Sequence, residues 1–205
     1  MIDFHYYLVT DRSLCKFGAL DECIRQACRS GIRAVQLREK DLAGRELYRL
    51  ARRLKSITVN FGAKLFINDR LDVAMAIGAD GIHCPEKGLP PEVVRQYAPE
   101  LKIGVSVHSP GAARKAEKSG ADFILFGPVY STRTKPGAEP RGVTALNNIA
   151  GQCRIPVFAI GGITPGRVRR CLDAGAWGVA GISSILSADE INQTVAEYAN
   201  NLGSL

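Results

Sequence analysis

The chain has 205 residues, with 27 Lys and Arg against 20 Asp and Glu, a formal net charge of +7 and 46% hydrophobic residues. This hydrophobic content excludes an intrinsically disordered chain. No apolar run approaches the roughly 18 residues of a membrane-spanning helix, so no membrane partner is expected. At this length, one domain over residues 1–205 is the default expectation, with two small domains as the alternative.

Six cysteines are scattered along the chain without a Cys-x-x-Cys pair, which argues against a zinc knuckle or a dithiol redox motif. The N-terminus shows no secretory signal, so we expect reduced thiols and a cytoplasmic location. Lys and Arg are spread along the chain, with small groups at residues 45–55 and 167–170, so a nucleic-acid partner is not expected. The positive charge fits a solvated exterior or the attraction of a small anion such as a phosphate ester.

Eight buried strands are predicted from short apolar runs, four of which follow a glycine that ends a helix-like segment. In chain order they lie within residues 6–10, 31–37, 64–67, 78–84, 102–107, 120–126, 156–160 and 175–182. The helices with assigned bounds cover residues 43–61, 70–77, 91–97, 110–119, 143–149, 165–174 and 189–202. Eight strand–helix units of about 26 residues each predict a single (β/α)₈ TIM barrel of the α/β class. A doubly wound open sheet is the alternative, without a Gly-x-Gly-x-x-Gly motif after the first strand to support it.

In such a barrel the functional residues lie in the loops at the carboxyl ends of the strands. The second strand ends with Gln36, Arg38 and Lys40, whose alternation places three polar side chains on one side. Because an arginine binds a carboxylate or phosphate with two donors, we interpret this group as a site for an anionic ligand. The alternative is a structural ion pair of Arg38 with Glu39 or Asp69.

The next three strands end with further polar side chains: Asn68 and Asp69, then His83, then Ser106 and His108. A histidine in such a place is either a proton-transfer group or a packed, hydrogen-bonded side chain. His108 lies close to two serines in the sequence and is the preferred candidate for proton transfer.

The last three loops are rich in glycine and hydroxyl groups. Their candidate binding residues are Thr132, Thr134, Lys135, Gly161, Gly162, Ile182 and Ser183. Glycine lets backbone N–H groups approach a phosphate closely, and a helix N-terminus adds a favourable dipole. Phosphate sites of barrels lie after the seventh and eighth strands, so the sequence predicts one there, with plain tight turns as the alternative.

Seven motifs, taken in order, resemble the thiamine-phosphate synthase/TenI superfamily over nearly the whole chain. They are residues 36–40, 68–69, 81–83, 104–106, 127–129 with 132–135, 160–163 and 182–183. The resemblance implies a (β/α)₈ barrel of thiamine biosynthesis, in agreement with the number of predicted strands. It also implies a phosphorylated thiazole as the substrate.

The synthase branch of this superfamily joins a pyrimidine diphosphate to a thiazole phosphate, and Mg²⁺ held by two acidic residues neutralises the leaving diphosphate. The resemblance implies that Asp69 is the first of these residues. Gly88 stands where the second is expected, and Lys87 beside it adds a positive charge. Because a hard cation needs oxygen ligands, we interpret the metal site as weakened.

The TenI branch is a thiazole tautomerase that moves a proton on a carboxythiazole phosphate and requires no metal. The weakened metal site favours this branch. Pro128 stands where TenI has its catalytic histidine, so that role does not transfer to this chain. The catalytic candidates that remain are His108, Arg38 and Asn68.

The sequence therefore predicts an isomerase, a thiazole tautomerase that requires no cofactor. One alternative is a Mg²⁺-dependent transferase, thiamine-phosphate synthase. Another is a non-catalytic regulatory protein that binds thiamine phosphates. The oligomeric state stays open, with a homo-oligomer among the options.

Overall fold

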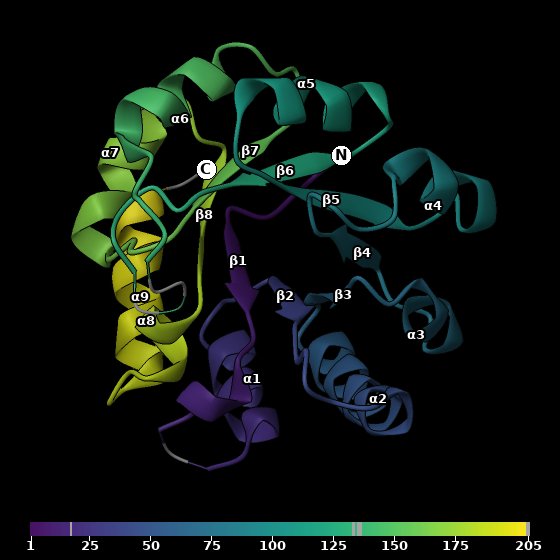
Figure 1. The fold of residues 1–205 in the computed structure, drawn as a ribbon. Helices are drawn as coiled ribbons and strands as arrows, with labels where there is room; N and C mark the ends of the chain where they lie inside the picture. The colour runs from purple at the N-terminus through teal and green to yellow at the C-terminus, as the bar shows by residue number, and fades with distance from the viewer. Residues whose placement is uncertain (17, 133, 135–136, 204–205) are drawn as a thin grey trace.

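A computed structural model describes residues 1–16, 18–132, 134 and 137–203. Its parallel strands form one closed barrel in sequence order (Figure 1). The strands are β1 (Tyr6–Val9), β2 (Ala34–Leu37), β3 (Lys64–Asn68), β4 (Gly81–Cys84), β5 (Lys102–Val107), β6 (Phe123–Phe126), β7 (Val157–Ile160) and β8 (Gly178–Gly181). The predicted (β/α)₈ barrel is confirmed. An open sheet is excluded because Tyr6 in β1 pairs with Val179 in β8.

The helices lie outside the barrel (Figure 1). They are α1 (Leu20–Arg29), α2 (Gly44–Asn60), α3 (Leu71–Ala76), α4 (Pro91–Tyr97), α5 (Pro110–Lys118), α6 (Gly142–Ala150), α7 (Val168–Asp173), α8 (Ser183–Leu186) and α9 (Ile191–Leu202), with 3₁₀ turns η1 (Arg12–Leu14) and η2 (Pro165–Arg167). Three of these elements begin at a proline, which fits a first turn because its missing N–H would have no helical partner there. Within the described ranges, no helix has the length and apolar character needed to cross a membrane.

Helix α2 shows how hydrophobic spacing sets the packing around the barrel. Its apolar residues recur at the helical period, and the same positions are the buried ones: Leu47, Leu50, Ala51, Leu54 and Ile57. They belong to the large core between the barrel and its surrounding helices. The helix therefore forms where the sequence predicts it and holds the loop that precedes it against the barrel mouth.

Aromatic rings fill the inside of the barrel: Phe4, Tyr7, Phe66, Phe123 and Phe158. The Phe66 and Phe123 rings meet edge to face with centroids 5.5 Å apart. Two glycines make room for them, because a Cβ on Gly81 would lie 2.4 Å from Phe66 and one on Gly104 would lie 2.4 Å from Phe123 Cζ. The mouth of the barrel thus has a packed aromatic floor.

The last unit differs from the predicted single helix. Strand β8 is followed first by α8, which begins at Ser183, and only then by α9. Ile185 and Leu186 of α8 are buried, so packing rather than intrinsic helix propensity stabilises this short turn. From the sequence we expected a loop here, because four residues are too few to show the helical periodicity of apolar side chains.

Candidate active site

The alternating residues at the end of β2 converge on a central cavity in the barrel mouth. Gln36, Arg38 and Lys40 all line this cavity, whose volume is about 170 Å³. Gln36 is only 1% exposed, and its amide nitrogen has no hydrogen-bond partner among the described residues. Because a buried donor without a partner costs free energy, this nitrogen is available to an acceptor on a ligand.

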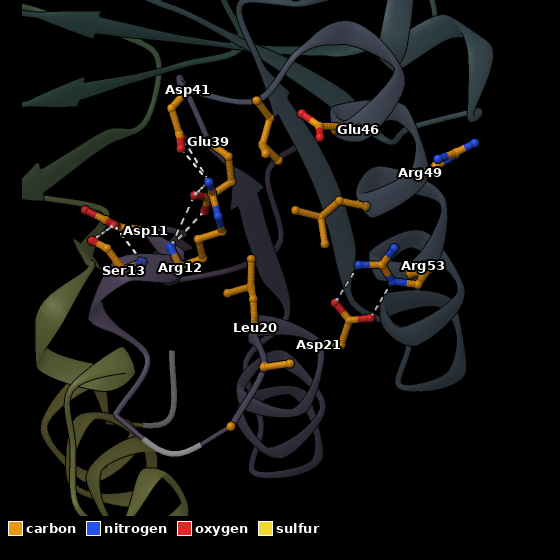
Figure 2. A pocket seen from close by; sticks show the side chains of 14 residues that line it. Asp11, Arg12, Ser13, Leu20, Asp21, Glu39, Asp41, Glu46, Arg49 and Arg53 are labelled. Atoms are coloured by element: carbon orange, nitrogen blue, oxygen red, sulfur yellow. Dashed lines mark hydrogen bonds and ion pairs between the residues drawn. The ribbon is translucent and has the colours of Figure 1, made fainter.

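Glu39 binds the loop after β1 instead of pairing with Arg38 (Figure 2). Its carboxylate accepts hydrogen bonds from the Thr10 hydroxyl at 2.7 Å and from Arg12 Nη1 at 3.1 Å. Thr10 Oγ1 in turn accepts a hydrogen bond from the Arg38 backbone N–H at 2.9 Å. Among the residues that the structure describes, Arg38 forms no ion pair with Glu39 or Asp69. Its guanidinium therefore stays available at the cavity.

A cavity of about 760 Å³, larger than the central one, lies beside the mouth between α1 and α2 (Figure 2). Several of its charged side chains pair with one another: Arg12 binds Asp41, and Arg53 Nε lies 2.6 Å from Asp21 Oδ2. The candidate site residues that the structure describes all lie elsewhere. Cavity size alone does not locate the active site in this molecule.

Asp69 and Gly88 lie against each other at the ends of β3 and β4. Asp69 adopts a left-handed backbone with φ of 63°, and its N–H donates to the His83 carbonyl at 3.0 Å. A Cβ on Gly88 would lie 2.8 Å from Asp69 Oδ1. Both residues line an outer cavity of about 420 Å³ together with Lys40 and Asn68. Residue 88 thus occupies a position from which a second carboxylate would meet that of Asp69.

Two histidines lie near the central cavity in different environments. His108 lines it, and its Nδ1 lies 2.7 Å from the Gly127 carbonyl oxygen. Because a carbonyl only accepts, Nδ1 carries the proton and Nε2 of the neutral ring is an acceptor. His83 is buried, and its Nε2 lies 2.9 Å from Oγ of Ser106, which lines the cavity. Burial, followed by the charge of Arg38, lowers the pKa of His83 to about 3, so this ring is neutral near pH 7.

The loops after β7 and β8 enclose a third cavity of about 40 Å³. Its lining includes the predicted phosphate residues Thr132, Thr134, Gly161, Gly162, Ile182 and Ser183. Gly161 and Gly162 have φ of 98° and 63°, and a Cβ on Gly162 would lie 2.2 Å from the Ser131 carbonyl oxygen. Glycine is therefore required at residue 162. The remaining predicted residue of this group, Lys135, lies outside the described residues.

Side chains that the sequence analysis missed hold this glycine loop. Arg167 Nη1 donates to the Gly162 carbonyl at 2.6 Å, and its guanidinium carbon lies 4.4 Å from the centroid of the Tyr130 ring. The Tyr198 hydroxyl of α9 donates to the Ile163 carbonyl at 2.7 Å. From the sequence we expected Arg167 to belong to a basic group on the solvated exterior. Arg167 follows the two glycines by about one helical turn, and this spacing in the sequence is the signal that indicates its contact with the glycine loop.

The three cavities adjoin one another in series through shared lining residues. The central cavity shares Thr132, Thr134 and Gly161 with the small cavity, and shares Lys40 and Asn68 with the outer one. In the closed barrel, β7 and β8 lie across the mouth from β3 and β4. The mouth therefore forms a trough, defined here as the three cavities together. Backbone donors and hydroxyls line one end, and charged side chains line the other.

Comparisons with known proteins agree with this geometry. Residues 6–185 match the sequence model of the family described as thiamine monophosphate synthase. The putative thiamine-phosphate synthase 2 of Aquifex aeolicus is 44% identical, over 88% of this chain and 96% of that protein. The thiamine-phosphate synthase of Clostridium novyi is 38% identical, over 97% and 98%. The solved thiamine phosphate pyrophosphorylase from Pyrococcus furiosus has a TM-score of 0.89 and 36% identity, over 97% of this chain and 95% of its own.

These comparisons correct the predicted branch of the superfamily. The prediction of a TenI-like thiazole tautomerase, and with it of an isomerase, is wrong, because relatives this similar are named as synthases. The prediction gave decisive weight to the carboxylate missing at Gly88. Mg²⁺ is commonly held by one or two carboxylates plus substrate phosphates, so the loss of one carboxylate does not exclude a synthase. By its sequence match and its relatives, the chain belongs to the thiamine monophosphate synthase family.

Proposed function

We propose that this protein is a thiamine-phosphate synthase, a transferase that couples a pyrimidine diphosphate to a thiazole phosphate and releases diphosphate. The observation that carries the proposal is the trough, which joins two polar ends across one central cavity. A reaction between two phosphorylated substrates needs an anion-binding site for each of them, and the trough offers one at either end. The names of the relatives support the same reaction.

The thiazole phosphate binds, in this proposal, at the small cavity after β7 and β8. The backbone N–H groups of Gly161 and Gly162 and the Ser183 hydroxyl are donors there. The Thr132 and Thr134 hydroxyls lie 3.0 Å apart and bond to each other, which leaves one of their two protons for a ligand. Hydrogen bonds to an ionised phosphate are stronger than those between neutral groups, so several donors in a small space select an anion. Lys135 stays a candidate from the sequence alone.

The diphosphate binds at the opposite end, where Lys40 and Asn68 line both the central and the outer cavity and Arg38 lines the central one beside them. Breaking the bond to the diphosphate places negative charge on the leaving oxygen. Positive groups held in position before the reaction stabilise that charge without reorganisation. The hydrogen bond from the Arg38 backbone to Thr10 fixes the base of the arginine for this role.

The donor set at Asp69 fits a Mg²⁺ ion that arrives with the diphosphate. Asp69 would hold the ion through its carboxylate, and phosphate oxygens of the substrate are the further ligands that such ions use. When bound, Mg²⁺ neutralises charge on the leaving diphosphate. Over the described parts of the chain there is no cluster of three or more His, Cys, Asp or Glu side chains, so the substrate's own oxygens are needed for this fit. Lys40 and Lys87 add positive charge at the same cavity.

The middle of the trough holds the reacting rings. The unpartnered amide nitrogen of Gln36, the Ser106 hydroxyl and the His108 ring are its polar groups. They orient the two rings toward each other by hydrogen bonds, and the apolar Leu125 and Ile160 supply contact surface. Holding two reactants in the correct orientation removes a large part of the activation barrier of a coupling reaction.

The test is Mg²⁺-dependent formation of thiamine phosphate from the two precursors, with diphosphate release measured in parallel. We expect both products in equal amounts, and a strong loss in Arg38→Gln. Arg49→Gln is the matched control, because it removes the same charge from α2 outside the trough. No coupling above the rate in buffer, with both precursors and Mg²⁺ present, would overturn the proposal.

A further inference from the structure

A buried histidine lies directly behind a residue of the trough. His83 on β4 is 1% exposed and is not part of the cavity wall, whereas Ser106 on the neighbouring strand β5 lines the central cavity. Their side chains meet through His83 Nε2 and Ser106 Oγ at 2.9 Å. The imidazole therefore controls one of the three hydrogen-bonding positions of the Ser106 hydroxyl, which has one donor and two acceptor sites.

The surroundings of the other ring nitrogen decide which nitrogen carries the proton. His83 Nδ1 has no hydrogen-bond partner among the described residues. A Cβ on Gly104 would lie 2.7 Å from this Nδ1 and 2.4 Å from Phe123 Cζ, so Nδ1 and the ring edge of Phe123 border the same point. An aromatic edge carries partial positive charge, which favours a lone pair over an N–H group beside it. This arrangement favours an unprotonated Nδ1 and a proton on Nε2.

We propose that His83 is a positioning residue: its Nε2–H donates to Ser106 Oγ and thereby turns the Ser106 hydroxyl proton toward the central cavity. Ser106 then acts as a donor to an acceptor atom of the bound substrate, such as an unprotonated ring nitrogen. With the opposite tautomer, Ser106 would donate to the histidine and offer the substrate only lone pairs. The part of the proposal that concerns turnover rests on the proposed synthase function.

A role in packing alone explains the site less well. Tyr7 and Phe123 surround the ring, with centroids 5.8 Å and 6.1 Å from that of His83. An apolar side chain would fill such a space without leaving a ring nitrogen unsatisfied, whereas a buried polar atom without a partner costs free energy. Within the described part of the chain, the imidazole makes one hydrogen bond, and it is directed at a residue that lines the central cavity.

The first arm of the test reads the tautomer without any substrate. The chain has three histidines, so ¹⁵N-histidine labelling gives a simple NMR spectrum, and the signals that disappear in His83→Gln belong to His83. At pH 7 we expect the neutral ring with the proton on Nε2, because protonated and bare ring nitrogens have well-separated ¹⁵N shifts. A proton on Nδ1, or a doubly protonated ring, would overturn the proposal whether or not the protein is a synthase.

The second arm measures turnover in His83→Leu, Ser106→Ala and the double variant. Each single change should lower kcat/KM by about tenfold, the usual effect of one hydrogen bond, and the double variant should lose no more than Ser106→Ala alone. His83→Gln keeps an N–H donor near the position of Nε2 and should recover most of the loss. His5→Gln, at the opposite end of the barrel beside Trp177, is the control and should match wild type.

The outcomes separate the two proposals. Wild-type protein without coupling activity would overturn the synthase function, while the tautomer remains measurable by NMR. A coupling enzyme in which His83→Leu folds, as judged by its unfolding transition, and turns over like wild type would overturn the positioning role. Losses that simply add in the double variant, or no recovery in His83→Gln, would also overturn it. If His83→Leu does not fold, the tautomer and the His83→Gln kinetics decide the question.

Discussion

In the proposed function, the two ends of the trough would bind anions by different means. The end after β7 and β8 relies on main-chain N–H groups in a loop whose shape requires glycine at residue 162, and Arg167 and Tyr198 hold that loop from outside. The end after β2 to β4 offers long side chains instead, Lys40 in the outer cavity and Arg38 in the central cavity beside it, with an open position at Gly88. Backbone geometry tolerates little change, whereas side-chain charge can be exchanged residue by residue. The first end should therefore be sensitive to shape and the second to charge.

The largest effect is expected from adding one methyl group at the glycine end. Gly162→Ala places a Cβ against the Ser131 carbonyl in a left-handed backbone, which should lower the free energy of unfolding by about 2 to 4 kcal/mol. Urea unfolding measures this, and the affinity for a thiazole phosphate should fall as well. Gly166→Ala is the control, because a Cβ there meets nothing within 4 Å. Equal stability of the two variants would contradict the requirement for glycine.

Removing a charge at the other end should weaken the binding of one substrate only. Arg38→Gln is expected to lower kcat/KM for the pyrimidine diphosphate by about 10- to 100-fold, as for loss of a charged hydrogen bond, without lowering stability measurably. The KM for the thiazole phosphate should stay within about twofold of wild type, since that substrate binds across the trough. Steady-state kinetics with each substrate varied in turn measures both values. A rise in the KM for the thiazole phosphate as large as that for the pyrimidine diphosphate would remove the distinction between the ends, whereas a lower kcat is expected whichever substrate is varied.

The packing beneath the glycine end can be probed by pH. Burial raises the pKa of the Cys171 thiol of α7 to about 11 from an ordinary value of 9.0. Between pH 9 and pH 11 the thiol loses its proton in the unfolded chain and keeps it in the folded protein. The free energy of unfolding therefore falls as the pH rises, by up to about 1.4 kcal/mol per pH unit. The stability advantage of wild type over Cys171→Ala should narrow accordingly from pH 9 to 11 in urea unfolding. A constant difference over this range would show that the thiol is not shielded.

The smallest effect concerns the open position beside Asp69. Gly88→Asp brings a second carboxylate to the outer cavity and should lower the Mg²⁺ concentration for half-maximal activity by about fivefold, as a further oxygen ligand strengthens a hard-cation site. Gly88→Ala is the control, because it adds the same Cβ without the charge. A matching shift in both variants would attribute the effect to the loop and not to the carboxylate.

The sequence predicts the architecture well because each unit carries its own local signals. One such signal is a glycine with positive φ that follows a helix and precedes a buried strand. It occurs four times, at Gly31, Gly78, Gly120 and Gly175. The polar alternation at Gln36, Arg38 and Lys40 likewise needs no tertiary information. Such signals repeat along the chain, so the number and order of strands could be derived without the structure.

The interactions that the sequence does not reveal join residues far apart along the chain. Thr10 and Glu39 meet only because β1 and β2 are neighbours, and Tyr198 reaches Ile163 only after α9 packs beside the last strands. The predicted branch was wrong for a related reason. The sequence shows Gly88 as a lost ligand, but the closeness of a Cβ at residue 88 to Asp69 and the adjoining of the cavities are properties of the folded mouth.

The pairing of β1 with β8 has a consequence for the order in which the chain can mature on the ribosome. Tyr6 has no partner in β8 until Val179 has been synthesised, and the glycine end also includes residues 181–183. Neither the barrel nor the trough can therefore close until the eighth strand has emerged. At typical rates of synthesis, the interval is about 10 to 35 seconds, during which the edge of β1 is open to other strands. A late, single closing step makes the whole chain, and not any half of it, the smallest unit that can acquire both ends of the trough.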